Sequence, residues 1–510
     1  MPHTYIKRIL NARVYDVAQE TPLDSMPLLS RRLQNHVLLK REDLQPVFSF
    51  KLRGAYNKMC QLSPEALARG VIAASAGNHA QGLALAAQKI GVKAVIVMPR
   101  TTPQIKVDAV RSRGAKVVLF GDTYDEAAAH AHQLMAERGL TYVHPYDDPD
   151  VIAGQGTVGM EILRQHPDAL HAVFVPVGGG GLCAGVAAYI KYLRPDVKIF
   201  AVESEDAACL DAAMKKNKRI QLPQVGLFAD GTAVAQIGKE TFRILRKTID
   251  GVITVNIDEI CAAIKDIFDD TRSIAEPSGA LALAGLKKHV RENNTQDQNL
   301  IAIDSGANIN FDHLRYISER TEIGEEREAV LAVAIPETPG SFKNFCTALG
   351  KRSITEFNYR YADSQQAHIF VGVQVAANSM GTEKYSDHQD LLESLKNKGY
   401  SVLDMSSSEI AKLHIRHMVG GHAPHIDNER LFRFEFPERP GALLKFLTSL
   451  GTRWNISLFH YRNHGSAHGR VLAGLQVPTT EYKQLDDWLN ALGYTWAEET
   501  NNPAYRLFLG

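Results

Sequence analysis

The chain has 510 residues, of which 45% are hydrophobic and 22% are charged, as in an ordinary globular protein of two or three domains. Its 57 basic side chains balance its 57 acidic ones, so we expect neither nucleic acid nor an anionic membrane surface as a partner. No uncharged apolar run approaches the roughly 18 residues that a transmembrane helix requires.

Five cysteines are scattered along the chain without any C-x-x-C pair; they are Cys60, Cys183, Cys209, Cys261 and Cys346. An odd count without a signal-like N-terminus is typical of a protein in a reducing compartment. We therefore expect a cytoplasmic protein.

The first part of the chain leads to a lysine in an unusual position. Residues 1–36 predict short helical pieces, the apolar run Val37–Leu39 predicts a strand, and Ser49 is placed to cap a following helix. Lys51 falls in the first turn of that helix, where the macrodipole lowers the pKa of an ammonium group. A lowered pKa suits an amine that attacks a carbonyl group, although a single lysine is more often a solvated surface residue.

Three further segments place a turn of small residues directly after an apolar strand. They are Ser75-Ala76-Gly77-Asn78-His79, Gly178-Gly179-Gly180-Gly181-Leu182 and Ser305-Gly306-Ala307-Asn308. Ligands of open α/β sheets bind outside the carboxyl ends of the strands, so we expect these segments and Lys51 to converge on one site.

From Val37 to about Tyr316, short apolar runs alternate with alanine-rich amphipathic segments, which predicts βαβ units and a parallel sheet. The expected strands are 71–74, 94–98, 116–119, 173–177 and 199–202, and the expected helices are 80–89, 104–112, 123–138 and 182–193. Gly91 and Gly114 are expected at C-terminal helix caps.

The tetraglycine turn Gly178–Gly181 can direct several backbone N–H groups at one point, beside the helix that starts near Leu182. Such a turn binds anions, and here it suits a cofactor phosphate. A dinucleotide is disfavoured, because the third glycine of a G-x-G-x-x-G pattern would fall on Cys183, and no Walker A lysine follows. Four glycines can also form a plain turn.

The wording Ser49-Phe50-Lys51-Leu52-Arg53-Gly54-Ala55, together with Ser75–Gly82, resembles the biosynthetic threonine deaminases. These are pyridoxal-phosphate lyases of the tryptophan-synthase-β type, and the resemblance covers residues 1 to about 320. It implies a catalytic domain with open parallel sheets, pyridoxal 5′-phosphate as the cofactor and L-threonine as the substrate. The implied reaction is elimination of water and release of 2-oxobutanoate and ammonia, the first step of isoleucine synthesis.

The resemblance also implies roles in cofactor binding. Lys51 would hold the cofactor and remove the Cα proton, Asn78 would face the 3′-oxygen of the pyridine ring, and Gly178–Leu182 would hold the phosphate. Ser305 would face the ring nitrogen. A neutral hydroxyl there leaves the ring a weaker electron sink than a carboxylate would, which favours elimination over transamination.

The substrate carboxylate would bind to the turn Ser75–His79 at a helix N-terminus, with His79 in a positioning role. Serine racemases resemble this chain but carry a serine at the position of Ala76, so we expect elimination without racemisation. Some relatives bind a divalent cation near the segment that matches Glu203–Cys209. Since Cys209 replaces the second carboxylate, we predict no such metal site. The role of Glu276 stays open between a residue that lines the site and a solvated carboxylate.

Beyond residues 321–327 the pattern becomes β-rich and an internal repeat appears. Val330–Gly340 returns as Leu431–Gly441, and Tyr359-Arg360 returns as Tyr461-Arg462. The copies resemble the paired ACT-like α+β module that follows the catalytic domain of biosynthetic threonine deaminases. We therefore predict a catalytic domain at 1–320, a linker at 321–327 and regulatory subdomains at 328–420 and 421–510. The alternative is an inert dimerisation module.

ACT-like modules bind amino acids at the turn between the first strand and the first helix, which points to Gly340 and Phe342 in one copy and Gly441 and Leu443 in the other. The resemblance implies isoleucine as the inhibitor, valine as a candidate activator and a homotetramer. Which copy binds which effector, and the preference for threonine over serine, stay open. One alternative is a broader serine/threonine dehydratase with different effectors. Another is an amino-acid sensor without turnover, which the presence of Lys51 disfavours.

Overall fold

The protein is described by a computed structural model over residues 2–311, 313–324, 327–350, 352–362, 364–376, 387–423, 426–437, 442–462 and 468–509. The chain divides into two compact units, Met1–Thr321 and Glu322–Gly510, and each has its own hydrophobic core. Within the described residues, no helix is long and apolar enough to cross a membrane.

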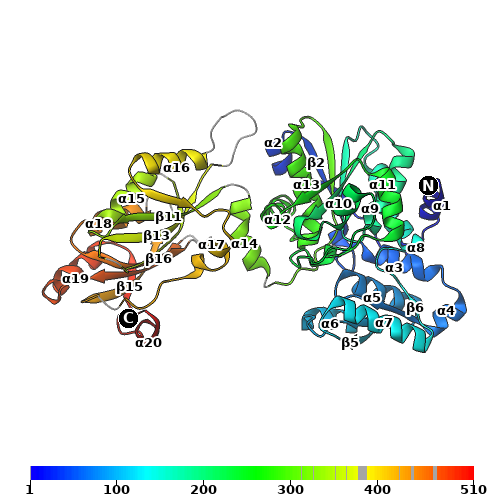
Figure 1. The fold of residues 1–510 in the computed structure, drawn as a ribbon, viewed down its shortest axis with the longest axis horizontal. Coiled ribbons are helices and arrows are strands. Elements are labelled where there is room, and N and C mark those ends of the chain that lie inside the picture. Colours follow the sequence, from blue (N-terminus) through cyan, green and yellow to red (C-terminus); the bar gives the residue numbers. More distant parts are fainter. Residues whose placement is uncertain are drawn as a thin grey trace. The chain divides into compact units, whose positions relative to one another are not determined.

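Two open sheets form the frame of the first unit (Figure 1). Their strands are β1 (Leu23–Ser25), β2 (His36–Arg41), β3 (Val71–Ala74), β4 (Ala94–Met98), β5 (Lys116–Leu119), β6 (Thr141–Tyr142), β7 (Ala172–Pro176), β8 (Lys198–Ser204), β9 (Gly251–Val255) and β10 (Asn299–Asp304). One sheet has the order β1-β2-β10-β7-β8-β9, and only the β1–β2 pair is antiparallel. The other sheet, β5-β4-β3-β6, is parallel throughout, which confirms the predicted fold class.

Helices follow most of these strands. They are α1 (Pro2–Leu10), α2 (Pro27–Leu33), α3 (Lys51–Cys60), α4 (Pro64–Arg69), α5 (Asn78–Ile90), α6 (Gln104–Arg111), α7 (Tyr124–Arg138), α8 (Pro149–Gln165), α9 (Gly181–Leu193), α10 (Cys209–Lys216), α11 (Lys239–Thr248), α12 (Ile257–Thr271), α13 (Pro277–Asn293) and α14 (His313–Gly324), with 3₁₀ turns η1 (Glu42–Leu44), η2 (Glu205–Ala207) and η3 (Asp230–Thr232).

Alternation along β3 explains why helices cover both faces of the smaller sheet. Val71 and Ala73 pack into the apolar cluster that contains α5, whereas Ile72 and Ala74 pack into the cluster that contains α7. Successive side chains of a strand point to opposite faces, so a run that is apolar at every position must be covered twice.

The predicted elements of this unit are confirmed closely. The strands expected at 71–74, 94–98 and 116–119 match β3, β4 and β5 residue for residue. Gly91 caps α5 with a φ of 79°. Gly114 also has a positive φ of 80°, but α6 already ends at Arg111, so Gly114 belongs to the turn beyond the helix cap.

An eight-stranded antiparallel sheet forms the frame of the second unit (Figure 1). Its elements are β11 (Glu328–Pro336), α15 (Ser341–Leu349), β12 (Ile354–Arg360), β13 (Gln366–Gln374), α16 (Asp387–Asn397), β14 (Ser401–Asp404), α17 (Glu409–Leu413), η4 (Ile415–His417), β15 (Glu429–Pro437), α18 (Ala442–Leu450), β16 (Asn455–Arg462), β17 (His468–Gln476), η5 (Thr479–Glu481), α19 (Tyr482–Ala491), β18 (Thr495–Glu498) and α20 (Pro503–Phe508). The strand order is β14-β11-β13-β12-β16-β17-β15-β18, with β12 and β16 adjacent at the centre.

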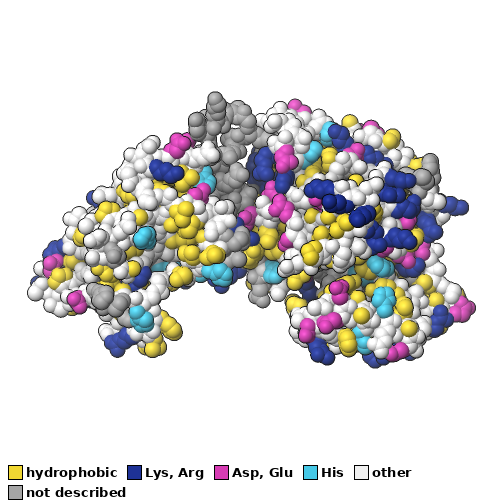
Figure 2. All heavy atoms as spheres, viewed as in Figure 1, with side chains coloured by type: hydrophobic (Ala, Val, Ile, Leu, Met, Phe, Trp, Pro, Cys, Tyr) yellow, Lys and Arg dark blue, Asp and Glu magenta, His cyan; other side chains and the backbone are white. Residues whose placement is uncertain are grey.

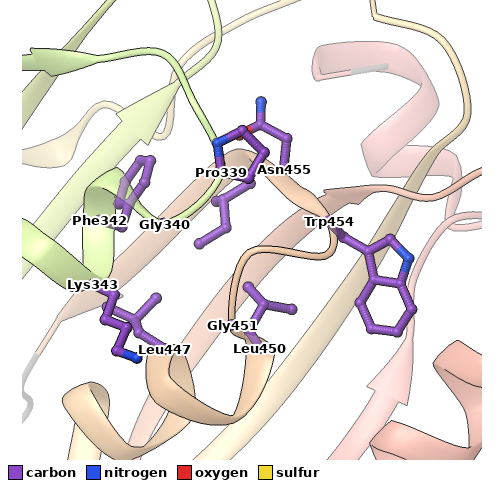
Figure 3. A pocket seen from close by; sticks show the side chains of 10 residues that line it. Pro339, Gly340, Phe342, Lys343, Leu447, Leu450, Gly451, Trp454 and Asn455 are labelled. Atoms are coloured by element: carbon purple, nitrogen blue, oxygen red, sulfur yellow. The ribbon is translucent and has the colours of Figure 1, made fainter.

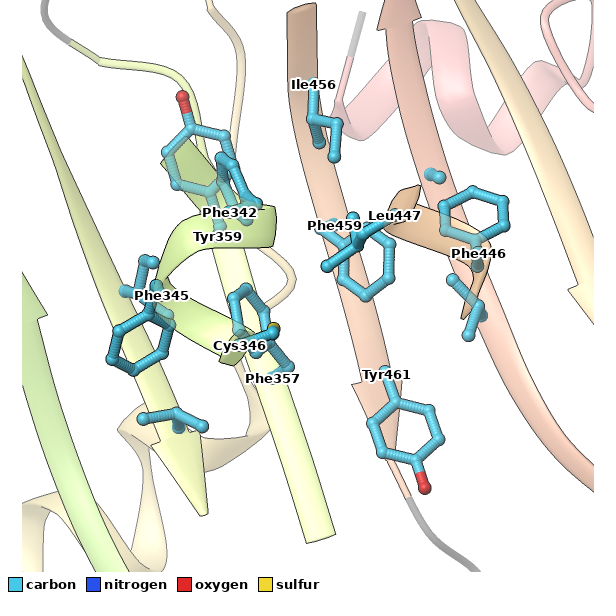
Figure 4. Packing of buried hydrophobic residues seen from close by; sticks show 14 of the residues in the cluster. Phe342, Phe345, Cys346, Phe357, Tyr359, Phe446, Leu447, Ile456, Phe459 and Tyr461 are labelled. Carbon is cyan, nitrogen blue, oxygen red and sulfur yellow. The ribbon is translucent and has the colours of Figure 1, made fainter. Parts of the chain in front are cut away.

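One continuous apolar core joins the two halves of this sheet. In Figure 4, Phe342 and Phe345 of α15 lie over β12, and Phe446 and Leu447 of α18 lie over β16. The rings of Phe357 and Phe459 meet across the β12–β16 pair, with their centroids 5.5 Å apart. The two halves of the second unit therefore share one hydrophobic core.

The helix α14 runs into the predicted linker at 321–327 and ends at Gly324. On the face seen in Figure 2, lysine and arginine side chains gather over α10 and α11, whose last turns carry Lys215, Lys216, Arg246 and Lys247. This patch is local, since basic and acidic side chains balance over the whole chain.

Candidate active site and regulatory pocket

One cavity of the first unit brings together residues from several strand ends. With its open mouth it encloses about 460 Å³ of empty space. It is lined by Phe50, Lys51, Asn78, Pro145, Tyr146, Pro176, Gly178, Gly179, Gly180, Gly181, Leu182, Gly231, Thr232, Glu276, Ser278 and Ser305. Lys51, Asn78, the glycine turn and Ser305 thus converge as the position of their strands predicts.

The start of α3 places Lys51 in this cavity. Ser49 pairs with Gly306 through an isolated β-bridge, and the Phe50 N–H donates to the Ser305 carbonyl at 3.3 Å. The prediction that Ser49 caps the helix is wrong, because Phe50 is the N-cap residue and the Ser49 hydroxyl makes no hydrogen bond to any described residue. The backbone bridge to Gly306 takes Ser49 away from the capping position.

Lys51 is the first residue of α3, and its Nζ donates to the Pro145 carbonyl at 3.2 Å. Burial lowers the pKa of the Lys51 amine to about 8, against a smaller opposing effect of the Glu276 carboxylate. Loss of hydration disfavours the charged ammonium form. A substantial fraction of this amine is therefore neutral and nucleophilic near neutral pH.

The glycine turn follows β7 and opens α9, so its N–H groups lie at a helix N-terminus. Gly180 has a φ of 89°, a conformation that residues with a side chain rarely adopt. A Cβ at Gly178 would lie 2.8 Å from the Thr232 Cα, and a Cβ at Gly179 would overlap the ring of Tyr146. Only glycines leave room there, which fits a cradle for a phosphate group.

The turn after β3 divides between the cavity and its surroundings. Asn78 lines the cavity, but Ser75, Ala76, Gly77 and His79 are not among the described residues that do so. The Ser75 hydroxyl accepts from the N–H groups of Gly77 and Ala80, both at 3.3 Å. This closes the turn at the start of α5.

His79 is turned to the backbone. Its Nε2 lies 2.8 Å from the carbonyl of Val143, the residue that directly follows β6. Burial, with a smaller effect of Lys51, lowers the pKa of His79 to about 3. The neutral ring is thus poorly placed to act as a base in the cavity.

Ser305 directly follows β10 and is buried in the cavity wall. Its hydroxyl donates to the Ser278 carbonyl at 3.3 Å. The Ser278 hydroxyl in turn lies 3.2 Å from the Thr232 hydroxyl. The part of the cavity wall formed by these three residues therefore presents hydroxyl groups and no charge.

The sequence left the role of Glu276 open, and the structure places it in the cavity wall, almost fully buried. Its Oε1 accepts from the Asn78 Nδ2 at 2.6 Å and its Oε2 accepts from the Asn308 N–H at 3.0 Å. Burial and Asp230 raise the pKa of Glu276 to about 7, although the two hydrogen bonds and Lys106 lower it in part. The solvated alternative is thereby excluded.

Sequence reasoning missed Pro145 and Tyr146, which line the cavity from the loop after β6. The loop is held by His144 Nδ1, which accepts from the N–H groups of Tyr146 and Asp147. The Asp147 carboxylate also accepts from the first N–H groups of α11. This loop follows the carboxyl end of β6, a further parallel strand. That position is the signal in the sequence that could have revealed Pro145 and Tyr146 as residues of the site.

Glu203 is buried beside Cys209, and this burial raises the pKa of its carboxyl group to about 7. The Glu203 carboxylate accepts from the N–H groups of Leu210 and Asp211, both at 2.8 Å, at the start of α10. Among the described residues, no group of three His, Cys, Asp or Glu side chains is arranged to hold a metal ion.

The second unit contains a pocket of about 250 Å³ between its two halves (Figure 3). It is lined by Pro339, Gly340, Phe342, Lys343, Leu447, Leu450, Gly451, Trp454, Asn455 and Ile456. Gly340 is the N-cap of α15 with a φ of 93°. Leu443 packs against the core, and Gly441 lies outside the described residues.

Comparison with known families gives two matches along the chain. Residues 14–306 match a family described as pyridoxal-phosphate dependent enzyme. Residues 319–415 and 420–509 match the C-terminal regulatory domain of threonine dehydratase.

Close relatives match over the full length. The biosynthetic L-threonine dehydratase of Burkholderia multivorans is 57% identical, with 99% of each chain covered. That of Escherichia coli is 56% identical, covering 99% of this chain and 97% of the relative. The chloroplastic biosynthetic threonine dehydratase of Arabidopsis thaliana is 50% identical and covers 99% of this chain and 84% of the relative.

Solved structures are similar to a little under two thirds of the chain. The processed form of threonine deaminase isoform 2 from Solanum lycopersicum has 52% identity and a TM-score of 0.62, covering 62% of this chain and 93% of that one. Maize serine racemase has 31% identity and a TM-score of 0.58, covering 61% and 95%.

Proposed function

The chain belongs to the family of pyridoxal-phosphate dependent enzymes that carry the C-terminal regulatory domain of threonine dehydratase, and on this basis we propose that it is a lyase converting L-threonine to 2-oxobutanoate and ammonia. One observation carries the proposal: an amine with a lowered pKa, a glycine cradle and a neutral serine hydroxyl face one cavity. Pyridoxal 5′-phosphate fits this set of donors.

The bound cofactor supplies an electron sink that permits cleavage of the Cα–H bond of the amino acid. The neutral Lys51 amine accepts the Cα proton, and burial keeps that amine available near neutral pH. The Cβ–O bond breaks, and the hydroxyl takes up one proton and leaves as water, which balances the proton that Lys51 accepts from Cα. The released enamine then takes up one water, so the nitrogen departs as ammonia and 2-oxobutanoate remains.

The other residues hold the reactants. The N–H groups of Gly178–Gly181 and Leu182, at the start of α9, hold the cofactor phosphate. Asn78 would face the 3′-oxygen of the ring, and Ser305 would face its nitrogen. The Ser305 hydroxyl, bonded to the Ser278 carbonyl, would offer the ring nitrogen a neutral partner in place of a carboxylate, which favours a weak electron sink and hence prompt loss of the β-hydroxyl.

The turn Ser75–His79 binds the substrate carboxylate through N–H groups at the start of α5. The Ser75 hydroxyl closes this turn, and the neutral His79 ring fastens it to the Val143 carbonyl. Ala76 offers no hydroxyl that could return a proton to Cα, so elimination proceeds without racemisation.

We assign residues 1–320 to catalysis, 321–327 to a connection, and 328–420 and 421–510 to two ACT-like regulatory subdomains. The two compact units and the same order of strand, helix, two strands, helix and strand in each half of the second unit support this division. The pocket beside Gly340 is the effector site, because Phe342, Leu447, Leu450 and Ile456 give it an apolar wall. Isoleucine acts there as an inhibitor, and valine is the candidate activator of the second unit.

A homotetramer in the cytoplasm is the expected working form, on the strength of the family resemblance. Light scattering during size exclusion tests the tetramer. The expected mass is four times the 56.3 kDa of the chain.

The deciding experiment measures 2-oxoacid formation by the purified full chain with pyridoxal 5′-phosphate. L-Threonine should give 2-oxobutanoate and equimolar ammonia, and L-serine serves as the comparison for specificity. A cofactor-loaded protein that binds isoleucine but releases no 2-oxoacid from either substrate would establish the sensor alternative and refute the lyase.

A further inference from the structure

Glu276 occupies the N-cap position of α13, yet its side chain makes no capping hydrogen bond to that helix. It enters the cavity instead and accepts one hydrogen bond on each carboxylate oxygen, from the Asn78 Nδ2 and from the Asn308 N–H. The Glu276 side chain thus bonds to Asn78 and Asn308, which belong to other segments, and leaves the N-terminus of α13 without a side-chain cap. This arrangement calls for a function other than helix termination.

The side chain of Asn308 completes a chain of hydrogen bonds. Its Nδ2 donates to the Val47 carbonyl at 2.8 Å and to the Asn78 Oδ1 at 2.7 Å. Its Oδ1 accepts from the Gln81 Nε2 at 3.1 Å. Asn78 is therefore held from both sides, by the Asn308 amide on its oxygen and by Glu276 on its nitrogen.

The Val47 carbonyl and an ionised Glu276, the two ends of this chain, can only accept hydrogen bonds, and this sets the direction of both amides between them. The Val47 carbonyl requires the Asn308 nitrogen, so Asn308 presents N–H to Asn78, and Asn78 must answer with its oxygen. At the other end an ionised Glu276 requires the Asn78 nitrogen. A flipped Asn78 would place oxygen against carboxylate and nitrogen against nitrogen.

This orientation leaves Asn78 with one uncommitted N–H beside the cavity that it lines. We propose that Glu276 and Asn308 are positioning residues, which lock the Asn78 amide so that it presents a donor to an anionic ring oxygen of the cofactor. The inference rests on the proposed function, because it requires that pyridoxal 5′-phosphate occupies this cavity.

The charged groups that face Glu276 come from four elements: Lys51 from α3, Lys106 from α6, Asp230 from η3 and Asp304 from β10. Burial and Asp230 raise the pKa of Glu276, whereas the Asn78 and Asn308 hydrogen bonds and Lys106 favour its ionised form. Replacing Glu276 thus changes both charge and hydrogen bonding, so the cleaner variant is Asn308→Ala, which keeps the carboxylate.

The test is a double-mutant cycle on the full chain without substrate. The dissociation constant of pyridoxal 5′-phosphate and the pH midpoint of its absorbance are measured for the wild type, Asn78→Ala, Asn308→Ala and the double variant. Asn308→Ala should weaken binding roughly tenfold or more, as expected for a lost hydrogen bond to a charged group. It should also raise the midpoint, because a donor to an oxyanion stabilises the anionic form.

A positioning residue acts only through its partner, so Asn308→Ala should have no further effect when Asn78 is already alanine. Gln81→Ala is the matched control, since it removes a contact to Asn308 that sets neither amide direction, and it should leave both quantities unchanged. Additive effects of Asn78→Ala and Asn308→Ala would overturn the inference. If Asn308→Ala does not fold, the cycle of Glu276→Gln with Asn78→Ala decides.

Glu276→Gln has one acceptor in place of two, so it cannot accept from both Asn78 and the Asn308 N–H. Its effect on cofactor affinity should shrink when Asn78 is alanine, and an undiminished effect would contradict the inference. A wild-type chain without a cofactor absorbance band would refute the proposed function itself. That outcome differs from one in which the cofactor band is present and the effects of the substitutions are additive, which would overturn the inference alone.

Discussion

The Arg53 guanidinium donates to both oxygens of the Glu161 carboxylate, at 2.6 and 3.0 Å, and both side chains are fully buried. Arg53 also binds the buried Glu42, and Lys40 binds Glu161 at 2.7 Å. Because Arg53 stands two residues after Lys51 on α3, this network ties the start of the helix to η1, β2 and α8.

Arg53→Met should destabilise the catalytic unit by about 3–5 kcal/mol, because Glu42 and part of Glu161 would stay buried without their partner. All three tryptophans, Trp454, Trp488 and Trp496, lie in the second unit. Circular dichroism therefore follows both units during urea unfolding, and tryptophan fluorescence follows the second one alone.

Arg53→Met should move only the unfolding transition of the catalytic unit to a lower urea concentration. This is the transition that circular dichroism detects and tryptophan fluorescence does not. Arg8→Ala is the control, since its ion pair with Asp150 is exposed and contributes about 0–1 kcal/mol. Equal shifts for Arg53→Met and Arg8→Ala would show that the buried network does not stabilise the fold.

Lys51→Ala should lower kcat by at least roughly 10²–10⁴-fold, because it removes the general base and the amine that holds the cofactor. Lys58→Ala is a matched control on the same helix, where Lys58 pairs with Asp148 at 2.8 Å outside the cavity lining. Turnover of threonine to 2-oxobutanoate is the measurement. Near-normal turnover by Lys51→Ala would remove Lys51 from the mechanism.

Cofactor capture by the apo protein should follow the titration of Lys51. With a pKa of about 8, the neutral amine increases about tenfold per pH unit below that value and then levels off. Stopped-flow absorbance after mixing with pyridoxal 5′-phosphate should show this plateau. A rate that climbs until about pH 10 would indicate an ordinary, hydrated lysine.

Gly179→Ala should weaken cofactor binding, because its Cβ would overlap the ring of Tyr146. Overpacking of this kind costs about 1–3 kcal/mol, or roughly 5–150-fold in affinity. Tyr146→Ala removes the overlapping ring, so the double variant should bind the cofactor more tightly than Gly179→Ala alone. Equilibrium dialysis provides the constants, and no recovery in the double variant would refute the steric account.

A chain truncated after Gly324 should still deaminate threonine but no longer respond to isoleucine. Allosteric coupling of about 1–3 kcal/mol would change the apparent threonine affinity of the full chain roughly 5–150-fold. Saturation curves with and without isoleucine give the comparison. In the full chain, Ile456→Phe fills the pocket from β16 and should abolish the response while leaving uninhibited turnover unchanged. A folded truncation that is still inhibited would move the effector site into the catalytic unit.

Much of the fold and site could be predicted from the sequence, because the signals are local. An apolar run must be buried, a glycine turn before a helix exposes N–H groups, and a lysine at a helix start meets the macrodipole. Such rules located β3, β4 and β5, the glycine turn and Lys51 without any knowledge of distant contacts.

Tertiary structure alone decided which side chains enter the cavity and in which state of charge. Asn78 points into it beside its neighbour His79, which is held by Val143 instead. Glu276 meets Asn78 across 198 residues of sequence, and burial among such distant segments sets the pKa of Lys51. The direction of a side chain and the loss of its hydration depend on neighbours that only the folded chain brings together, and no local pattern encodes them.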